Sequence, residues 1–227
     1  MFLIKICGVT SAEDALLATA LGADAVGFVF APSKRQIAVR AVSEIIRQLP
    51  PEIMTVGVFR NETQERVVKT VNEIGLRAAQ LHGHETPEMC KWVADRIPVT
   101  IKALSAGSKD LERFDKFSAD FLLLDSPNPG SGKVFDWALA ERVPANLPIL
   151  LAGGLNSDNV KNAIKRVKPS GVDVSSGVEK SNGKKDPRLL RNFIKAVRDC
   201  DTSPIDSRDE SAIGDDESMP FDWEVGS

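Results

Sequence analysis

Eight short apolar segments, each followed by a polar turn and a stretch with helical spacing, constrain the fold of this 227-residue chain more than any other feature. In order they read FLIKICG, AVGFVFA, MTVGVFRN, AAQLHG, VTIKAL, FLLLDS, PILLAGG and GVDVSSG. Near-continuous apolar strands that alternate with helices are typical of a parallel sheet covered on both faces. Eight such units in about 200 residues predict a single (β/α)8 barrel, a TIM barrel, near the lower size limit of that fold.

Helix-start signals support this alternation. Thr10 and Glu13 have the spacing of a capping box, and Asp136 and Asn156 are placed to cap later helices. A doubly wound open sheet is the alternative architecture. It normally has fewer strands, and its dinucleotide-binding form carries a GxGxxG motif after the first strand, which this chain lacks.

The end of the chain differs in composition from the rest. Residues 201–227 hold nine acidic residues and one basic residue, Arg208. We expect residues 1–200 to form the catalytic barrel domain and residues 201–227 to form a disordered acidic tail. The body then keeps 28 of the 29 Lys and Arg and 23 of the 32 Asp and Glu. This mildly basic balance suits a small anionic ligand and argues against a nucleic-acid partner.

The cysteines and the N-terminus indicate a cellular compartment. Cys7, Cys90 and Cys200 are odd in number and widely spaced, without the pattern of a zinc site or a disulfide framework. The first apolar run is short and interrupted by Lys5, so it is neither a signal peptide nor a membrane span. We expect a cytoplasmic protein without a membrane partner, either a monomer or a homodimer.

Polar residues interrupt the apolar strands near their ends. Alternate side chains of a barrel strand point inward. On this alternation we expect an inward polar set of Lys5, Cys7, Gln80, His82, Lys102, Asp125, Asp173 and Ser175. Unpaired burial of such groups is costly, so they should pair with one another or line a solvated pocket. Lys5 and Lys102 either pair with Asp125 or Asp173, or contact a ligand.

Two of these residues suggest acid and base chemistry at the ends of the strands, where barrel enzymes place their active sites. Cys7 takes the last inward position of the first strand, two residues after Lys5, whose ammonium favours a thiolate. Asp125 ends an apolar wall, where a carboxyl can hold a proton as a general acid. The simpler alternatives are a small buried hydrophobe for Cys7 and a turn or capping residue for Asp125.

The sequence predicts no metal site. His82 is a possible base, ligand or hydrogen-bond partner, but no second inward histidine or carboxylate cluster accompanies it. Arg35 follows the second strand and either binds a carboxylate with its guanidinium fork or is a solvated loop charge.

Glycine-rich loops follow the seventh and eighth strands, where barrels commonly hold a phosphate with backbone amides. Gly153 and Gly154 permit close approach of a ligand to the backbone, and Ser176 and Gly177 would complete the cradle. The GSGK segment at 130–133 lacks the flanking residues of a nucleotide-binding P-loop, and we interpret it as a lid.

Together these segments resemble a known family. KICGVT, ADAVGFVF, SKRQI, VGVFRNE, QLHG, LLLDS, GSGKVFDW, LAGGLNSDNV and GVDVSSGVE are similar, in order and spacing, to the signature segments of the phosphoribosylanthranilate isomerases. The resemblance runs from Lys5 to Val197. It implies an aldose–ketose isomerase of tryptophan biosynthesis that acts on a small phosphoribosyl substrate by an Amadori rearrangement, with no cofactor and no metal.

The resemblance also implies roles for individual residues. Asp125 would protonate the furanose ring oxygen, and the Cys7 thiolate would then remove the proton from C2 of the sugar. Arg35 would bind the anthranilate carboxylate. The backbone amides of Gly154, Ser176 and Gly177 would hold the phosphate, and Gly153 would belong to the same binding loop. His82 and Asp173 would only position the substrate.

Other phosphosugar barrels are the nearest alternatives. The related aminoaldose isomerase of histidine synthesis uses two aspartates, and indole-glycerol phosphate synthase uses a lysine and glutamate pair. Neither explains Cys7. A non-catalytic phosphosugar-binding protein would be expected to lack Cys7 or Asp125, and this chain has both.

Overall fold

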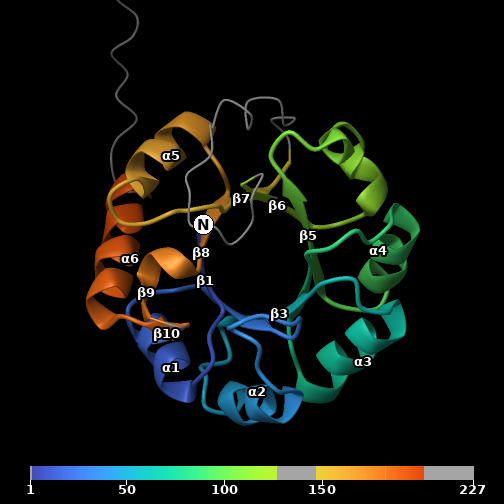
Figure 1. The fold of residues 1–227 in the computed structure, drawn as a ribbon, viewed down its shortest axis with the longest axis horizontal. Helices are drawn as coiled ribbons and strands as arrows, with labels where there is room; N and C mark the ends of the chain where they lie inside the picture. Colours follow the sequence, from blue (N-terminus) through green and yellow to red (C-terminus); the bar gives the residue numbers. More distant parts are fainter. Residues whose placement is uncertain (1, 127–146, 182, 202–227) are drawn as a thin grey trace, which may run out of the picture.

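A computed structural model describes residues 2–126, 147–181 and 183–201 of the chain. Within these residues, eight parallel strands form a closed barrel in chain order, with β1 adjacent to β8 (Figure 1). The strands are β1 (Leu3–Cys7), β2 (Ala25–Val29), β3 (Met54–Phe59), β4 (Ala78–Leu81), β5 (Val99–Ser105), β6 (Phe121–Asp125), β7 (Ile149–Leu151) and β8 (Gly171–Val174). All eight predicted segments therefore form strands, and the TIM-barrel prediction is confirmed.

Helices surround the barrel (Figure 1). They are α1 (Ala12–Ala20), α2 (Val39–Ile46), α3 (Gln64–Ile74), α4 (Pro87–Ala94), the 3-10 segment η1 (Lys109–Phe117), α5 (Val160–Val167), the 3-10 turn η3 (Ser176–Val178) and α6 (Pro187–Asp201). The cap of α1 differs from the prediction by one residue. Ser11, not Thr10, accepts a hydrogen bond from the amide of Asp14, because the helix begins one residue later than the capping-box spacing indicated.

Two apolar layers hold the fold together. A larger cluster, which includes Ile4, Phe28 and Leu122, packs the outer faces of the strands against the helices. A smaller cluster fills the barrel interior and includes Val56, Ile101 and Leu123. The closed barrel therefore has a packed centre, and polar inward side chains lie above this plug.

Lys102 differs from the sequence prediction. Its neighbours Ile101 and Ala103 belong to the interior cluster, so strand alternation directs Lys102 to the opposite, helix-facing side. There its ammonium lies over the ring of Phe117 and pairs with Glu85. The predicted inward direction of Lys102 was wrong, because β5 is buried on both faces and its sequence does not identify which alternate set faces inward.

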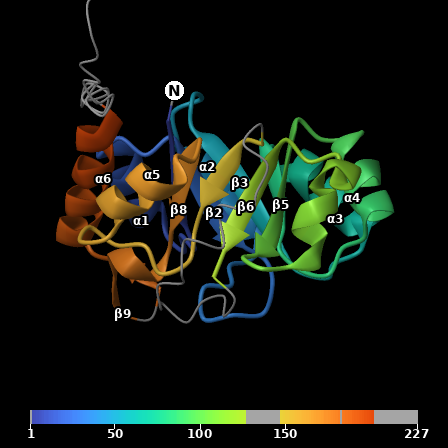
Figure 2. The same cartoon turned by 90° about the horizontal axis from the view of Figure 1, so that it is seen from above.

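A β-hairpin that the sequence did not suggest follows η3. Its strands β9 (Glu179–Ser181) and β10 (Lys184–Lys185) pair in antiparallel fashion outside the barrel. Figure 2 shows β9 at the end of the molecule opposite the N-terminus, which is the end where the barrel strands finish.

Several predictions fall on residues that the structure does not describe. The GSGK segment and Asp136 lie in 127–146, and all of the predicted tail except Asp201, the last residue of α6, lies in 202–227. Among the described residues, no helix has both the length and the apolar composition needed to cross a membrane.

Candidate active site

A cavity of about 320 Å³ opens at the carboxyl ends of the strands. Its walls bring together most of the residues predicted for the site, although they come from distant parts of the chain. The predicted residues that line it are Cys7, Arg35, His82, Asp125, Gly153, Gly154, Asp173 and Ser176. Gly177 is the one predicted site residue that does not line this cavity, and it lies directly behind the wall, as described below.

Cys7 ends β1 and is buried, with 8% of its surface exposed. A Cβ at Gly27 on the neighbouring strand would lie 3.1 Å from both the Cys7 Sγ and the Lys5 Nζ, so the two groups share the space that this glycine leaves. Burial raises the pKa of the Cys7 thiol above its ordinary value, and the opposing attraction of Lys5 offsets this only in part. Lys5 therefore favours the thiolate, as the sequence predicts, but in this structure the cost of burying the charge on the sulfur exceeds that gain.

Lys5 has a second partner. Its Nζ donates a hydrogen bond to Oδ1 of Asp173 at 2.7 Å, across the β1–β8 pairing. Burial by itself would lower the pKa of Lys5, but the attraction of Asp173 and Cys7 outweighs it, and the pKa is raised. Of the two open interpretations of Lys5, the structure supports the ion pair with Asp173.

Asp125 ends β6, which β7 and β8 separate from β1 around the barrel, and it is buried, with 7% of its surface exposed. Its Oδ1 accepts a hydrogen bond from the amide of Ser126 at 2.7 Å, and its Oδ2 lies 3.3 Å from Nε2 of His82. The other ring nitrogen of His82, Nδ1, lies 2.8 Å from Nε2 of Gln80. In the tautomer with the proton on Nε2, the Gln80 amide donates to Nδ1 and the imidazole N–H faces Asp125.

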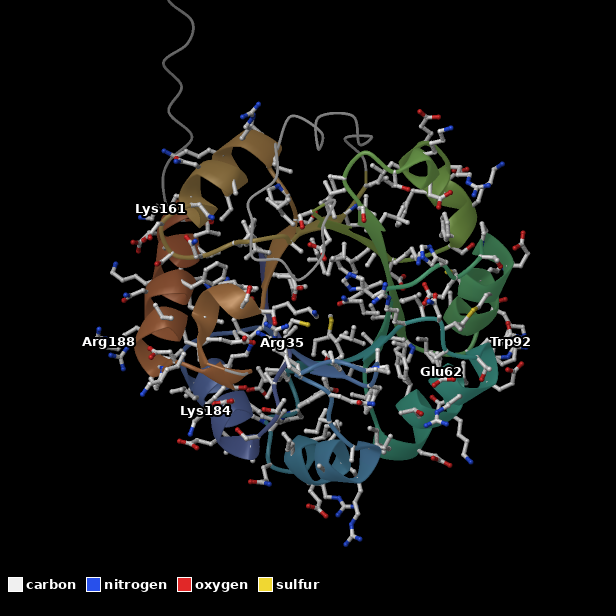
Figure 3. The ribbon with its side chains drawn as sticks, in the orientation of Figure 1. Arg35, Glu62, Trp92, Lys161, Lys184 and Arg188 are labelled. Atoms are coloured by element: carbon white, nitrogen blue, oxygen red, sulfur yellow. The ribbon has the colours of Figure 1, made fainter. Side chains whose placement is uncertain are left out.

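Arg35 lines the cavity at the mouth of the barrel, and Figure 3 shows it near the centre while Trp92 lies on the outer rim. Its guanidinium makes a two-pronged contact with Glu179, at 2.6 Å from Nε and 2.8 Å from Nη2. This contact raises the pKa of Arg35. The alternative of a solvated loop charge is excluded for Arg35, because its side chain is only 13% exposed.

The two glycine-rich loops meet behind the cavity. Gly153 and Gly154 both have positive φ angles, at 86° and 70°, a region that favours glycine. A Cβ at Gly153 would also approach Oδ1 of Asp125 to 3.1 Å. A Cβ at Gly177 would overlap the carbonyl oxygen of Leu155, so Gly177 lets the loop after β8 pack onto the loop after β7.

A second cavity of about 400 Å³ adjoins the first and shares Arg60, His82 and Asp125 with it. Its floor holds the buried pair of Lys102 and Glu85, 2.5 Å apart. Burial would raise the pKa of Glu85, but Lys102 and backbone amides outweigh it, and the pKa is lowered. Lys102 also donates hydrogen bonds to the carbonyl oxygens of Leu81 and Gly83. It is therefore a structural lysine that holds the loop after β4 in place.

Sequence reasoning missed three charged residues near the site, namely Glu85, Glu179 and Lys185. Each follows the end of a barrel strand, in a loop or in the hairpin, and most of their partners lie far away along the chain. In the Arg35–Glu179 pair the partners are 144 residues apart. The one available signal was the predicted burial of Lys5 and Lys102, which required acidic partners.

The arrangement is suited to proton transfer. The Cys7 thiol and the Asp125 carboxyl line one cavity. The imidazole of His82 lies beside the carboxyl. The positive charges of Lys5, Lys185 and Arg35 lie around the thiol. In the part of the chain that the structure describes, no group of three or more His, Cys, Asp or Glu side chains is arranged to hold a metal ion.

Comparisons with known proteins agree with this geometry. The family model for N-(5'phosphoribosyl)anthranilate (PRA) isomerase matches residues 4–196. The N-(5'-phosphoribosyl)anthranilate isomerase of Desulforudis audaxviator (strain MP104C) is 47% identical over 207 residues, which cover 88% of this chain and 100% of the relative. The crystal structure of the phosphoribosyl anthranilate isomerase of Thermus thermophilus matches with a TM-score of 0.82 and 38% identity, covering 87% of this chain and 99% of that one.

One solved relative contains a ligand. A phosphoribosyl anthranilate isomerase in complex with reduced 1-(o-carboxyphenylamino)-1-deoxyribulose 5-phosphate matches with a TM-score of 0.77 and 42% identity, covering 88% of this chain and 100% of that one.

Proposed function

This chain belongs to the N-(5'-phosphoribosyl)anthranilate isomerase family, and we propose that Cys7 and Asp125 are the general base and the general acid of its reaction. The enzyme converts N-(5'-phosphoribosyl)anthranilate into 1-(2-carboxyphenylamino)-1-deoxyribulose 5-phosphate in tryptophan biosynthesis. One observation carries the assignment of the pair. Cys7 and Asp125 line the same cavity from β1 and β6, which are well separated around the barrel, so they can act on two sides of one sugar.

The first half of the reaction opens the sugar ring. Asp125 gives its proton to the furanose oxygen, the bond from C1 to that oxygen breaks, and the nitrogen lone pair forms a C1=N double bond. His82 lies 3.3 Å from Asp125 through Nε2, so it holds the carboxyl in position. The product of this half is an open-chain cationic Schiff base.

The second half moves hydrogen between carbons. The Cys7 thiolate takes the proton from C2, and the released electron pair neutralises the C1=N group to give an enolamine. Tautomerisation then adds a proton at C1 and removes one from the C2 hydroxyl, which leaves the ketone. The proton count balances without an oxidant or reductant, so the chemistry requires neither a cofactor nor a metal. The positive charges of Lys5 and Lys185 favour the thiolate form of Cys7 and would stabilise it when it forms.

The two ends of the substrate have separate sites in this proposal. Amides of Gly154, Ser176 and Gly177 hold the phosphate, since Gly153 and Gly154 permit close approach and the packed loops fix the cradle. Arg35 binds the anthranilate carboxylate at the other side of the mouth, with Glu179 fixing the guanidinium. Asp173 acts by positioning Lys5 beneath Cys7.

Mutation of the pair tests the assignment. The assay follows loss of the fluorescent substrate, made in situ, in Cys7→Ser and Asp125→Asn. Each variant should lose on the order of a hundredfold or more in kcat while still binding a reduced product analogue. Cys200→Ser and the exposed Asp158→Asn are the matched controls and should keep parental rates. Full activity of Cys7→Ser would remove the thiolate from the mechanism.

We also propose that the enzyme works in the cytoplasm as a monomer or homodimer. Cys7, Cys90 and Cys200 are all free thiols, which suits a reducing compartment. Light scattering of the purified full chain distinguishes the two assembly states.

A further inference from the structure

Lys185 is a buried lysine that the reaction outlined above uses only as a charge near Cys7. It lies on β10, outside the barrel, and only 2% of its surface is exposed. Its Nζ has three acceptors, the carbonyl oxygen of Cys7 at 2.6 Å, the carbonyl oxygen of Ser175 at 3.1 Å and Oε1 of Glu179 at 3.0 Å. An ammonium has three donors, so every N–H of Lys185 has a partner and the charged form fits this position.

The contacts of Lys185 join the ends of two barrel strands. Cys7 is the last residue of β1, and Ser175 directly follows β8. The backbone amide of Lys185 also lies 3.3 Å from Oδ2 of the buried Asp14 on α1. The hairpin therefore fastens the carboxyl end of β1 to its neighbours, at the residue that carries the sulfur.

Glu179 extends this network to the arginine. Its carboxylate accepts from Lys185 and, on both oxygens, from Arg35. The stem of Arg35 lies against Gly8, where a Cβ would overlap the arginine Cδ. Gly8 has a φ of 72° and directly follows Cys7, so Arg35 and Lys185 both lie against the segment of Cys7 and Gly8.

We propose that Lys185 is a positioning residue for Cys7, which holds the end of β1 in place and supplies a positive charge that favours the thiolate. This inference rests on the proposed role of Cys7 as the general base. In this proposal the β9–β10 hairpin takes part in the reaction, although the side chain of Lys185 does not touch the substrate.

The charges around Cys7 support this role. The charged or titratable groups that face it come from four elements and from the opposite wall of the cavity. They are Lys5 on β1, Arg35 after β2, Asp173 on β8, Lys185 on β10, and His82 and Asp125 across the cavity. Burial raises the pKa of Cys7, Asp173 adds to the rise, and Lys5 and Lys185 lower it. Burial also lowers the pKa of Lys185, while Glu179 acts in the opposite direction.

The competing interpretation is a purely structural link between the hairpin and the barrel. Both interpretations predict that loss of Lys185 destabilises the fold, because two carbonyls and a carboxylate lose a partner. Only the positioning role also predicts a change in the titration of Cys7. The test therefore measures the thiol directly.

The experiment compares Lys185→Met with Lys184→Met. Lys184 is the neighbouring residue of β10, its side chain is 66% exposed, and Figure 3 shows it on the outer rim. Iodoacetamide alkylation of Cys7 is followed by mass spectrometry of its peptide across a pH series, which separates it from Cys90 and Cys200. In Lys185→Met the pKa of Cys7 should rise by about one unit, so that alkylation below the pKa is about tenfold slower. Lys184→Met should match the parent.

Thermal unfolding of each variant shows that the titrated protein is folded. If Lys185→Met does not fold, Lys185→Gln keeps a donor without the charge, and the same rise in the pKa of Cys7 is expected. An unchanged titration of Cys7 in a folded Lys185 variant would overturn the proposal. That result is independent of the proposed function, which fails instead if Cys7→Ser keeps full activity.

Discussion

Nε2 of His82 lies 3.3 Å from Oδ2 of Asp125, at the wall shared by the two cavities. Gln80 lies on the other side of the imidazole, and with the ring proton on Nε2 its amide donates to Nδ1. The proposed general acid thus has an imidazole nitrogen within hydrogen-bonding distance, which can orient the carboxyl.

Replacement of this imidazole should slow the reaction less than loss of the acid itself. We expect His82→Ala to lower kcat by up to about tenfold, since a hydrogen bond contributes about 0.5–1.5 kcal/mol. The control is His84→Ala, because His84 is exposed and lines only the second of the two cavities. A steady-state assay of both variants decides this. Equal rates for His82→Ala and the parent would show that Asp125 does not need its neighbour.

The Lys5–Asp173 pair should be important for stability. Its lysine is fully buried, so Lys5→Met leaves a buried carboxylate without its cation. We expect the free energy of unfolding to fall by about 3 kcal/mol, measured by denaturant titration. Lys69→Met is the control, because the Lys69–Glu73 pair is exposed on α3 and should change stability by less than about 1 kcal/mol. A loss as small as the control's would mean that Asp173 finds another partner.

Glu85 should make the fold sensitive to acid. Its folded-state pKa is lowered from the ordinary value of 4.5, so its contribution is present above the ordinary pKa and is lost as the pH falls through the lowered one. Glu85→Gln should therefore be less stable than the parent at neutral pH, with a gap that narrows in acid. Unfolding curves at several pH values measure this gap, with the exposed Glu73→Gln as the control. A gap that stays constant on acidification would contradict the lowered pKa.

Much of the barrel could be predicted from sequence because each strand is a local apolar run. The inward alternation also located Cys7, His82 and Asp125 correctly on one cavity, since a single parity rule applies along each strand. Lys102 shows where this rule fails. A strand that is buried on both faces does not reveal which alternate set points inward, and the partner of Lys102 lies in a loop whose path depends on tertiary structure.

The hairpin and the state of Cys7 were harder to predict for related reasons. Glu179 contacts Arg35 and Lys185 contacts the end of β1, and these pairs are 144 and 178 residues apart along the chain. The pKa of Cys7 depends on a balance between burial and several charges. The sequence shows that Lys5 is near, but the extent of burial appears only in the folded structure.

The contact between the two glycine loops should control phosphate binding. A side chain at Gly177 would overlap the Leu155 carbonyl oxygen, so Gly177→Ala must move the loop after β8 away from the loop after β7. We expect KM for the substrate and the inhibition constant of inorganic phosphate each to rise by about tenfold, which corresponds to about 1.4 kcal/mol, with a smaller change in kcat. Gly75→Ala is a suitable control, because Gly75 ends α3 with a φ of 74° and open space around it. That variant should lose stability through backbone strain and leave phosphate inhibition unchanged. Equal inhibition constants of inorganic phosphate in the two variants would show that Gly177 does not take part in phosphate binding.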